Sequence, residues 1–136
     1  MPPTDHYVAE TEFKVRYAET DAMGIVHHRQ YIVYFEVGRT DYSHQRGKPY
    51  SEFEANGLYL TVTEISVQYR LPARYDQHLK ILTWIENVKS RGLTFAYEIR
   101  DAQRDELLVN GWTKHICIDR EGNVSRIPEA WRDWAN

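Results

Sequence analysis

Polar and apolar residues alternate along most of the second half of the chain. A two-residue period is typical of β-strands that bury one face. It predicts strands over residues 60–69, 79–85, 93–99 and 107–119. The phase shifts once between Val62 and Ile65, which indicates a β-bulge. Because short loops join these segments, neighbouring strands are most simply antiparallel.

The first strand is predicted near the N-terminus, after a polar arm formed by residues 1–10. Phe13, Val15 and Tyr17 alternate there with two basic residues, as in a half-buried strand. Residues 20–27 contain an aspartate and a glycine and are expected to form a loop.

The longest helix is predicted over residues 28–45. One of its faces is formed by aromatic residues and a glycine at helical spacing, namely Tyr31, Tyr34, Phe35, Gly38 and Tyr42. Ile32, Val33 and Val37 fall on other faces, and a helix that is apolar nearly all round is normally buried. Residues 31–35 alone also fit a strand, because β-branched and aromatic side chains are frequent there.

Two shorter helices complete the pattern. One is predicted over residues 49–55 and should end at Asn56-Gly57. The other is predicted over residues 127–134, after a turn at residues 121–123. A strand, a buried helix and four further strands predict the α+β class, with the helix covering one face of an antiparallel sheet. A length of 136 residues predicts a single domain over residues 1–136.

Composition narrows the function classes. The net charge is −3 and no run of Lys and Arg stands out, which argues against a nucleic-acid-binding protein. No apolar stretch approaches the roughly 18 residues of a membrane span, and the N-terminus is unlike a signal peptide. With Cys117 as its single cysteine, the chain is expected in the reducing cytoplasm. Four Trp, ten Tyr and four Phe indicate a large buried sheet or an interface.

Candidate chemistry is concentrated just before the long helix, where Asp21, Gly24, His27 and His28 occur together. The start of a helix offers unpaired N–H groups and a partial positive charge, which stabilise a developing oxyanion. A carboxylate beside it can act as a nucleophile or as a general base. The same residues also fit a simple turn, in which Asp21 caps the backbone and Gly24 adopts a positive φ.

A metal site formed by His27 and His28 with Asp21 or Glu19 is disfavoured. Adjacent side chains of an extended segment point to opposite sides, so both histidines rarely bind one ion. A coherent spacing of third and fourth ligands is also missing. No metal is therefore expected.

Three further features have structural and functional interpretations. Lys89, Ser90 and Arg91 form a basic connection between two strands, which could bind phosphate groups or be a solvated hairpin. Glu36 and Arg39 lie three positions apart on the apolar helix and are expected to form an ion pair. Cys117 lies between two isoleucines and is interpreted as a core residue.

One extended motif resembles a known family. Residues 15–28 read VRYAETDAMGIVHH and include the fairly specific pattern Thr-Asp-x-x-Gly-Ile-Val. Weaker matches follow in order at Tyr31, Tyr34-Phe35-Glu36, Gly38-Arg39 and residues 70–76, 93–99, 111–113, 119, 122 and 126–128. The chain thereby resembles hotdog-fold acyl-CoA thioesterases of the 4-hydroxybenzoyl-CoA thioesterase group, which includes the thioesterases associated with the Tol–Pal system.

The resemblance implies a hotdog fold, in which a curved antiparallel sheet of about five strands wraps around a long central helix. It also implies a homodimer, often assembled into a homotetramer, with the site at the subunit interface. By position, Asp21 matches the catalytic carboxylate. His28 matches the residue at the helix start whose N–H polarises the thioester carbonyl, and its side chain is thought to assist catalysis.

The remaining site residues follow from the same resemblance. Gly24, Val26 and His27 belong to the loop that forms the oxyanion site, although His27 departs from the aromatic residue that is common there. Lys89, Ser90 and Arg91 lie where relatives bind the phosphates of CoA. No cofactor is implied, because coenzyme A is part of the substrate.

The leading hypothesis is therefore hydrolysis of a small aromatic or short-chain acyl-CoA to the free acid and CoA. A hotdog hydratase or dehydratase is the first alternative, since His28 could serve as its acid or base. A non-catalytic acyl-CoA-binding protein is the second alternative. Neither a nucleic-acid partner nor membrane insertion is expected.

Overall fold

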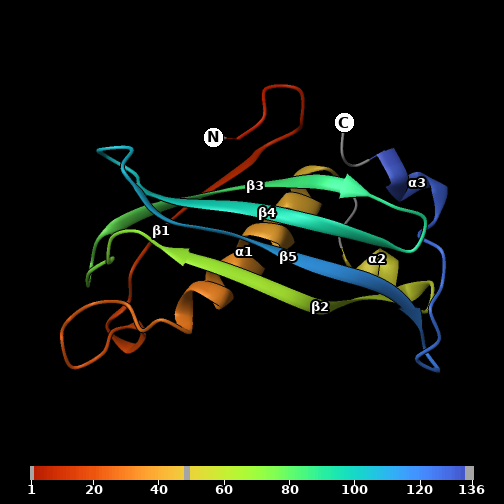
Figure 1. Cartoon of the computed structure of the whole chain (residues 1–136), viewed down its shortest axis with the longest axis horizontal. Coiled ribbons are helices and arrows are strands. Elements are labelled where there is room, and N and C mark those ends of the chain that lie inside the picture. Colours follow the sequence, from red (N-terminus) through yellow and green to blue (C-terminus); the bar gives the residue numbers. More distant parts are fainter. Residues whose placement is uncertain (1, 48–49, 134–136) are drawn as a thin grey trace.

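A five-stranded sheet packs against one long helix (Figure 1). The structure is a computed structural model and describes residues 2–47 and 50–133. The strands are β1 (Ala9–Lys14), β2 (Leu58–Tyr69), β3 (His78–Val88), β4 (Gly92–Asp101) and β5 (Leu107–Asp119). The helices are the short 3₁₀ turn η1 (Tyr17–Glu19), α1 (Gln30–Gln45), α2 (Tyr50–Ala55) and α3 (Glu129–Arg132).

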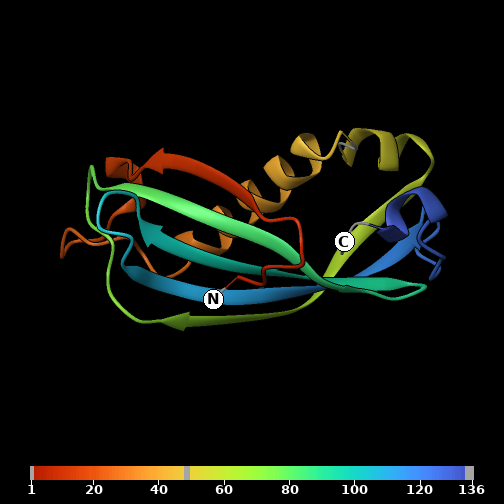
Figure 2. The same cartoon turned by 90° about the horizontal axis from the view of Figure 1, so that it is seen from above.

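The strand order is β1-β3-β4-β5-β2, and every neighbouring pair is antiparallel. The sheet curves along α1, and α2 and α3 lie beyond the far end of the helix (Figure 2). This architecture confirms the predicted α+β class and the hotdog arrangement. β1 and β2 are the two edges of the sheet, which matters for assembly because an edge strand has unpaired backbone groups.

The predicted β-bulge is confirmed in β2. The register with β5 shifts between Val62 and Glu64, so one extra residue is inserted at Thr63. Because the bulge restores the phase, Ile65 shares the helix-facing side of the sheet with Val62. The break in the sequence pattern was therefore the signature of a real irregularity.

The core forms where α1 lies against the sheet. Phe35 is fully buried and stacks on Tyr97 of β4, with ring centroids 4.2 Å apart and planes 3° from parallel. Close approach depends on two glycines, since a Cβ at Gly38 would collide with Thr83 and a Cβ at Gly111 with the backbone oxygen of Ser66. These side chains and contacts fix the position of the helix relative to the sheet.

Two predictions about the first third of the chain are wrong in detail. The first strand lies over Ala9–Lys14, so the predicted polar arm of residues 1–10 overlaps it, and Tyr17 is 78% exposed in η1. Alternation predicts which side chains are buried but not where pairing with β3 ends. The chain leaves the sheet at Arg16, where a capping box with Glu19 starts the 3₁₀ turn.

The long helix is confirmed, but it is not buried all round. Ile32, Val33 and Val37 remain 38%, 48% and 42% exposed, because the sheet covers only one side of α1. The helix also begins at Gln30 rather than at residue 28. The N–H of Gln30 donates to the carbonyl of His27, which ends the preceding loop.

The smaller elements agree with the sequence. α2 ends before Gly57, which has φ +77° as expected of a helix-terminating glycine. Cys117 is fully buried in β5, and burial raises the pKa of its thiol. The predicted helix over residues 127–134 corresponds to α3, while residues 49 and 134 lie outside the described residues.

Candidate active site

The loop between η1 and α1 is closed by backbone contacts. Single bridges join Thr20 to Val26 and Ile25 to Arg74. The N–H of Asp21 donates to the carbonyl of Ile25, and Gly24 adopts φ +77° at the tip. Gly24 therefore has the turn geometry predicted for it, and it presents Asp21 at the mouth of a loop that is tied to the β2–β3 connection.

Glu19 anchors this loop to the helix. Its carboxylate is almost completely buried and accepts hydrogen bonds from the Arg16 N–H, from the Tyr34 hydroxyl at 2.9 Å and from the Gln30 side chain at 3.3 Å. Burial, followed by the bond to Glu19, raises the pKa of Tyr34 well above its ordinary value. Glu19 is thus a structural acceptor that holds the start of α1 against the loop.

Asp21 has one oxygen engaged and one available. Its Oδ1 accepts a hydrogen bond from the Met23 N–H at 2.8 Å, while Oδ2 has no partner in the described part of the chain. The side chain lines a cavity of about 420 Å³ together with Val26 and His28. The turn interpretation and the catalytic interpretation are therefore compatible, because the carboxylate can do both at once.

His28 precedes α1 by two residues and lies at its positive end. Its N–H donates to no acceptor among the described residues, whereas its carbonyl accepts a hydrogen bond from the Tyr69 hydroxyl at 2.9 Å. An unpaired N–H beside a helix start can bind a carbonyl oxygen that gains negative charge. The residue with the free carboxylate oxygen and the residue with the free backbone donor thus line the same cavity.

His27 has a different position. Its Nδ1 accepts a hydrogen bond from the Arg29 N–H at 3.2 Å, and its ring lies 4.2 Å from the ring of His28. His27 is not among the residues that line the cavity. The contacts of the His27 side chain are therefore with the start of α1 and with the ring of His28.

Two tyrosines of the cavity were not predicted as site residues. Tyr31 is nearly buried, and its hydroxyl accepts a hydrogen bond from the Ala73 N–H at 3.2 Å; burial raises its pKa. Tyr69 is 52% exposed and packs edge-on against Tyr31, with centroids 5.5 Å apart. Both were assigned to element faces by their spacing, and only the tertiary structure shows that these faces meet at the cavity.

Lys89, Ser90 and Arg91 lie far from Asp21 in one chain. They form the exposed β3–β4 hairpin and line another cavity, of about 470 Å³, with Thr63 and Lys114. The strand β3 separates that hairpin from the Asp21 loop, and its 11 residues span roughly 35 Å at about 3.3 Å per residue. The two predicted parts of the site are therefore at opposite ends of the sheet (Figure 1).

Two absences concern only the described residues 2–47 and 50–133. They contain no group of three or more His, Cys, Asp or Glu side chains placed to hold a metal ion. No helix among them is long and apolar enough to cross a membrane. The pair His27 and His28 thus has no third ligand in this part of the chain.

The structure has a long helix against a curved five-stranded antiparallel sheet, and a loop with a carboxylate residue, Asp21, precedes the helix. This combination defines the thioesterase type of hotdog fold. Residues 15–135 match the family described as the thioesterase-like superfamily. The chain belongs to this family. The predictions of a hotdog fold and of a thioester hydrolase are thereby confirmed at the level of the family.

Individual relatives agree with this assignment. The chain is 36% identical over 129 residues to YneP of Bacillus subtilis (strain 168), to which acyl-CoA thioesterase activity is ascribed, covering 94% of this chain and 93% of YneP. It is 30% identical over 106 residues to the acyl-CoA thioester hydrolase YbgC of Escherichia coli O157:H7, covering 78% of each. The structure of a DHNA-CoA thioesterase from Staphylococcus aureus superposes with a TM-score of 0.86 at 34% identity, covering 93% of this chain and 85% of that chain.

Proposed function

We propose that this protein hydrolyses an acyl-CoA thioester to a free carboxylic acid and CoA at the Asp21–His28 cavity. The supporting observation is the presence, in one cavity, of an unpaired Asp21 oxygen and the unpaired N–H of His28. A carboxylate and an oxyanion donor are the minimum that acyl transfer to water needs. The membership in a thioesterase family points in the same direction.

Two routes use this arrangement. In the first, Asp21 attacks the thioester carbonyl carbon, the C–S bond breaks to release CoA thiolate, and water hydrolyses the resulting anhydride. In the second, Asp21 takes a proton from water, the resulting hydroxide attacks the carbonyl carbon, and the C–S bond breaks to release CoA thiolate, which the proton held by Asp21 can neutralise. In both, the His28 N–H stabilises the negative oxygen. In this proposal the His28 side chain orients water or protonates the thiolate.

The test is Asp21→Asn in an assay of thiol release. The change keeps the size of the side chain and removes its basicity, so the rate should fall by about 10²–10⁴-fold. Near-wild-type turnover by a folded Asp21→Asn protein would contradict the proposal. Hydration of an enoyl-CoA without release of thiol would instead support the hydratase alternative.

We infer that the acyl group is small and either aromatic or short and aliphatic. The cavity is bounded by apolar side chains, including Met23, Ile25, Leu71 and Pro72, and it is about 420 Å³ in volume. A panel of aromatic and aliphatic acyl-CoAs, compared by kcat/KM, measures this preference. A preference for long-chain acyl groups would contradict it.

We further propose that the working unit is a homo-oligomer built on a dimer through β2. β2 is a 12-residue edge strand with no neighbour on one side, and Val62, Ile65 and Tyr69 are 38%, 40% and 52% exposed along it. Antiparallel pairing of two β2 strands brings the Lys89 end of one chain toward the Asp21 end of the other. A second chain can therefore supply the CoA-phosphate contacts that one chain places too far away.

Mixed dimers test this arrangement directly. One chain contains Asp21→Asn and the other contains Lys89→Ala with Arg91→Ala. If each site combines Asp21 of one chain with the hairpin of its partner, the mixed dimer keeps one site without any change. Its activity should then recover to about half of the wild-type value, above either homodimer. Absence of recovery would show that Asp21 and the hairpin do not act across the interface.

A further inference from the structure

The backbone of His28 makes a single hydrogen bond within the described part of the chain. Its carbonyl accepts from the Tyr69 hydroxyl at 2.9 Å, and its N–H has no acceptor there. The next two N–H groups are held locally, since that of Arg29 donates to His27 Nδ1 and that of Gln30 donates to the His27 carbonyl. Contacts within the loop therefore hold the residues after His28, whereas His28 itself is held from the sheet.

Tyr69 has a well-anchored position at the end of β2. Its backbone pairs with Val109 of β5, and the N–H of the following Arg70 donates to the carbonyl of Leu108 at 2.8 Å. Its ring packs against that of the buried Tyr31, with the two planes 68° apart. A side chain that is fixed at its backbone and along its ring can hold a polar group in one place. The Tyr69 hydroxyl is therefore suited to orient the group that it contacts.

The segment that follows Tyr69 holds the other half of the cavity. The carbonyl of Ala73 accepts a hydrogen bond from the Val26 N–H at 2.8 Å, and a single bridge joins Arg74 to Ile25. These contacts tie down the loop that presents the carboxylate. One stretch of chain, from the end of β2 into the β2–β3 connection, therefore contacts both the carboxylate loop and the residue with the unpaired backbone donor.

The orientation of the His28 backbone matters for the proposed chemistry. A donor stabilises an oxyanion at about 2.7–3.1 Å from that oxygen, and a misplacement of about 1 Å can reduce the rate by about 10²-fold. His28 also lies outside α1, which begins at Gln30. Without the bond from Tyr69, the backbone groups of His28 would have no hydrogen bond in the described part of the chain.

We propose that Tyr69 is a positioning residue for the hydrolysis proposed above. Its hydroxyl holds the carbonyl of His28 and thereby keeps the His28 N–H directed at the thioester oxygen while Asp21 acts on the carbonyl carbon or on water. The hydroxyl transfers no proton in the reaction, because its proton is already donated to His28. The inference rests on the proposed function, since the direction of this N–H affects a rate only if an oxyanion forms beside it.

The first test is steady-state hydrolysis by Tyr69→Phe of the acyl-CoA that the wild type uses best. The change removes the hydroxyl and keeps the ring on Tyr31, so kcat should fall by about tenfold. The value of KM should change by less than about twofold, because the lost interaction acts in the transition state and the ring still lines the cavity. The Tm should stay close to the wild-type value, since the ring contact with Tyr31 is retained.

Tyr75→Phe is the matched control. Tyr75 also has an exposed side chain and lies six residues further along the same connection, but it does not line the Asp21 cavity. Its side chain contacts the ring of Tyr17, and its hydroxyl makes no hydrogen bond in the described part of the chain. Removing this hydroxyl should leave both kcat and KM unchanged.

Infrared difference spectroscopy provides a readout that a merely structural role would not change. The same acyl-CoA, labelled with ¹³C at the thioester carbonyl, is bound to the Asp21→Asn protein. A hydrogen bond to the thioester oxygen polarises the carbonyl and lowers its stretching frequency. Adding Tyr69→Phe should move the band toward the frequency of the unbound thioester, whereas adding Tyr75→Phe should leave it in place.

The outcomes separate this inference from the proposed function. An inactive Asp21→Asn protein together with an unchanged kcat in Tyr69→Phe overturns the inference alone. A raised KM with an unchanged kcat, or an infrared band that Tyr69→Phe does not move, overturns it as well. A fully active Asp21→Asn protein together with a slower Tyr69→Phe protein would contradict the role of Asp21 and support that of Tyr69. If the wild type hydrolyses no acyl-CoA of the panel, both proposals fail.

Discussion

The two edges of the sheet are built differently. β1 is six residues long and has charged residues on its outer face, whereas β2 is twelve residues long and exposes apolar side chains. Unpaired edge strands tend to pair with other chains, and short length and charge are the usual protection against this. One edge is therefore protected and the other is open.

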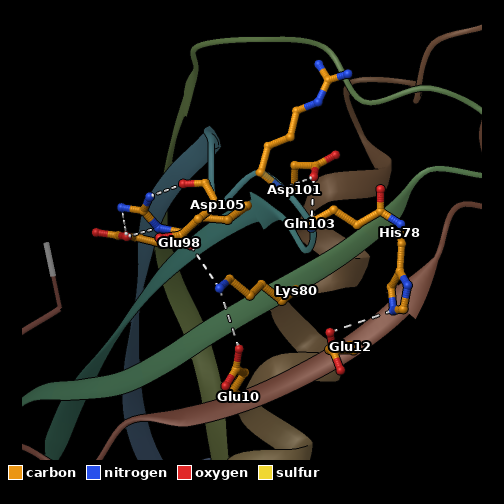
Figure 3. Close-up of polar contacts among 10 residues, drawn as sticks. Glu10, Glu12, His78, Lys80, Glu98, Asp101, Gln103 and Asp105 are labelled. Atoms are coloured by element: carbon orange, nitrogen blue, oxygen red, sulfur yellow. Dashed lines mark hydrogen bonds and ion pairs between the residues drawn. The ribbon is translucent and has the colours of Figure 1, made fainter.

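Ion pairs cover the outer face at the β1 edge (Figure 3). Lys80 of β3 lies 3.8 Å from Glu10 of β1 and 2.8 Å from Asp105 in the β4–β5 hairpin. His78 lies 3.8 Å from Glu12. On the inner side, the Gln45 side chain of α1 donates a hydrogen bond to the carbonyl of Glu10 at 3.3 Å. The helix thus satisfies part of the backbone edge that β1 would otherwise present.

The β2 edge lies beside the functional part of the molecule. Tyr69, its last residue, lines the Asp21 cavity and donates to the carbonyl of His28. Tyr59 and Leu60, near its start, line another cavity of about 370 Å³ between α1 and α2. Residues of β2 therefore line both of these cavities. Assembly through β2, as proposed above, would place both cavities at or near the interface.

The largest expected effect comes from a charge on the open edge. Ile65→Asp introduces a carboxylate at a 40% exposed apolar position of β2, and it should separate the proposed dimer into monomers. The value of kcat/KM should fall by about 10²–10³-fold, because the site loses the partner's contacts. Light scattering coupled to size-exclusion chromatography measures the mass. Lys14→Asp on β1 is the control, and an unchanged mass for Ile65→Asp would refute assembly through β2.

Substitutions at two glycines compare how tightly the chain is packed next to β2 and next to β3. Gly111→Ala drives its Cβ into the backbone oxygen of Ser66 in β2, which cannot rotate away, and into Phe35 at 3.0 Å. Gly38→Ala meets only the side chains of Thr83 and Ile81 in β3, which can shift. Gly111→Ala should lower the free energy of unfolding by about 3 kcal/mol and Gly38→Ala by less. Chemical denaturation that ranked them in the opposite order would contradict this packing argument.

The side of the sheet next to β2 also contains a buried polar chain. The Tyr97 hydroxyl lies 2.6 Å from Thr113 Oγ1, which lies 2.7 Å from Nε2 of His115, a residue that is 4% exposed. Burial lowers the pKa of His115 from 6.5 to about 4. As the pH falls, His115 is therefore protonated in the unfolded chain before it is protonated in the folded chain. The free energy of unfolding has its full value above pH 6.5 and decreases toward pH 4.

The loss across that range should be roughly 2–3 kcal/mol. His115→Gln should make the free energy of unfolding nearly independent of pH between 6.5 and 4. Below pH 4 the dependence should remain, because the lowered pKa values of Asp101 and Asp105 act there. Urea denaturation at several pH values measures both. An unchanged slope in the His115→Gln protein would show that His115 does not titrate in this way.

The smallest effect is expected at the protected edge. Lys80→Ala removes the pairs with Glu10 and Asp105, of which the bond to Asp105 is the main cause of the raised pKa of Lys80. Pairs of this kind on a sheet surface contribute at most about 1 kcal/mol and are screened by salt. Unfolding midpoints at low and high salt should differ less in the Lys80→Ala protein than in the wild type. A mass change in this variant would mean that β1, too, takes part in assembly.

Much of the fold could be predicted from the sequence, because alternation and helical spacing report burial directly. The four later strands, the bulge after Val62 and the helix through Tyr31 and Tyr42 were all predictable in this way. Strand ends were less predictable, as the shift of the first strand to Ala9–Lys14 shows. The pairing of β1 with β3 stops where β3 ends or where the chain turns into η1. A local sequence pattern contains no information about either.

The candidate site was predictable in part. Asp21, Gly24 and His28 lie in one contiguous motif, so a local resemblance identified them, and the structure places Asp21 and His28 in one cavity. Tyr69 and Tyr31 are far apart in sequence and reach the cavity only through the packing of β2 against α1.

The sequence by itself determined the α+β class, the order of the elements and the chemistry of the loop before the helix. These properties depend on local spacing and residue type, which are present in the chain without folding. The tertiary structure alone decided that the Lys89–Arg91 hairpin lies at the opposite end from Asp21, that one sheet edge stays open, and that α1 has an uncovered face. Burial, neighbours and distance between remote segments arise from packing, and packing is a property of the whole chain.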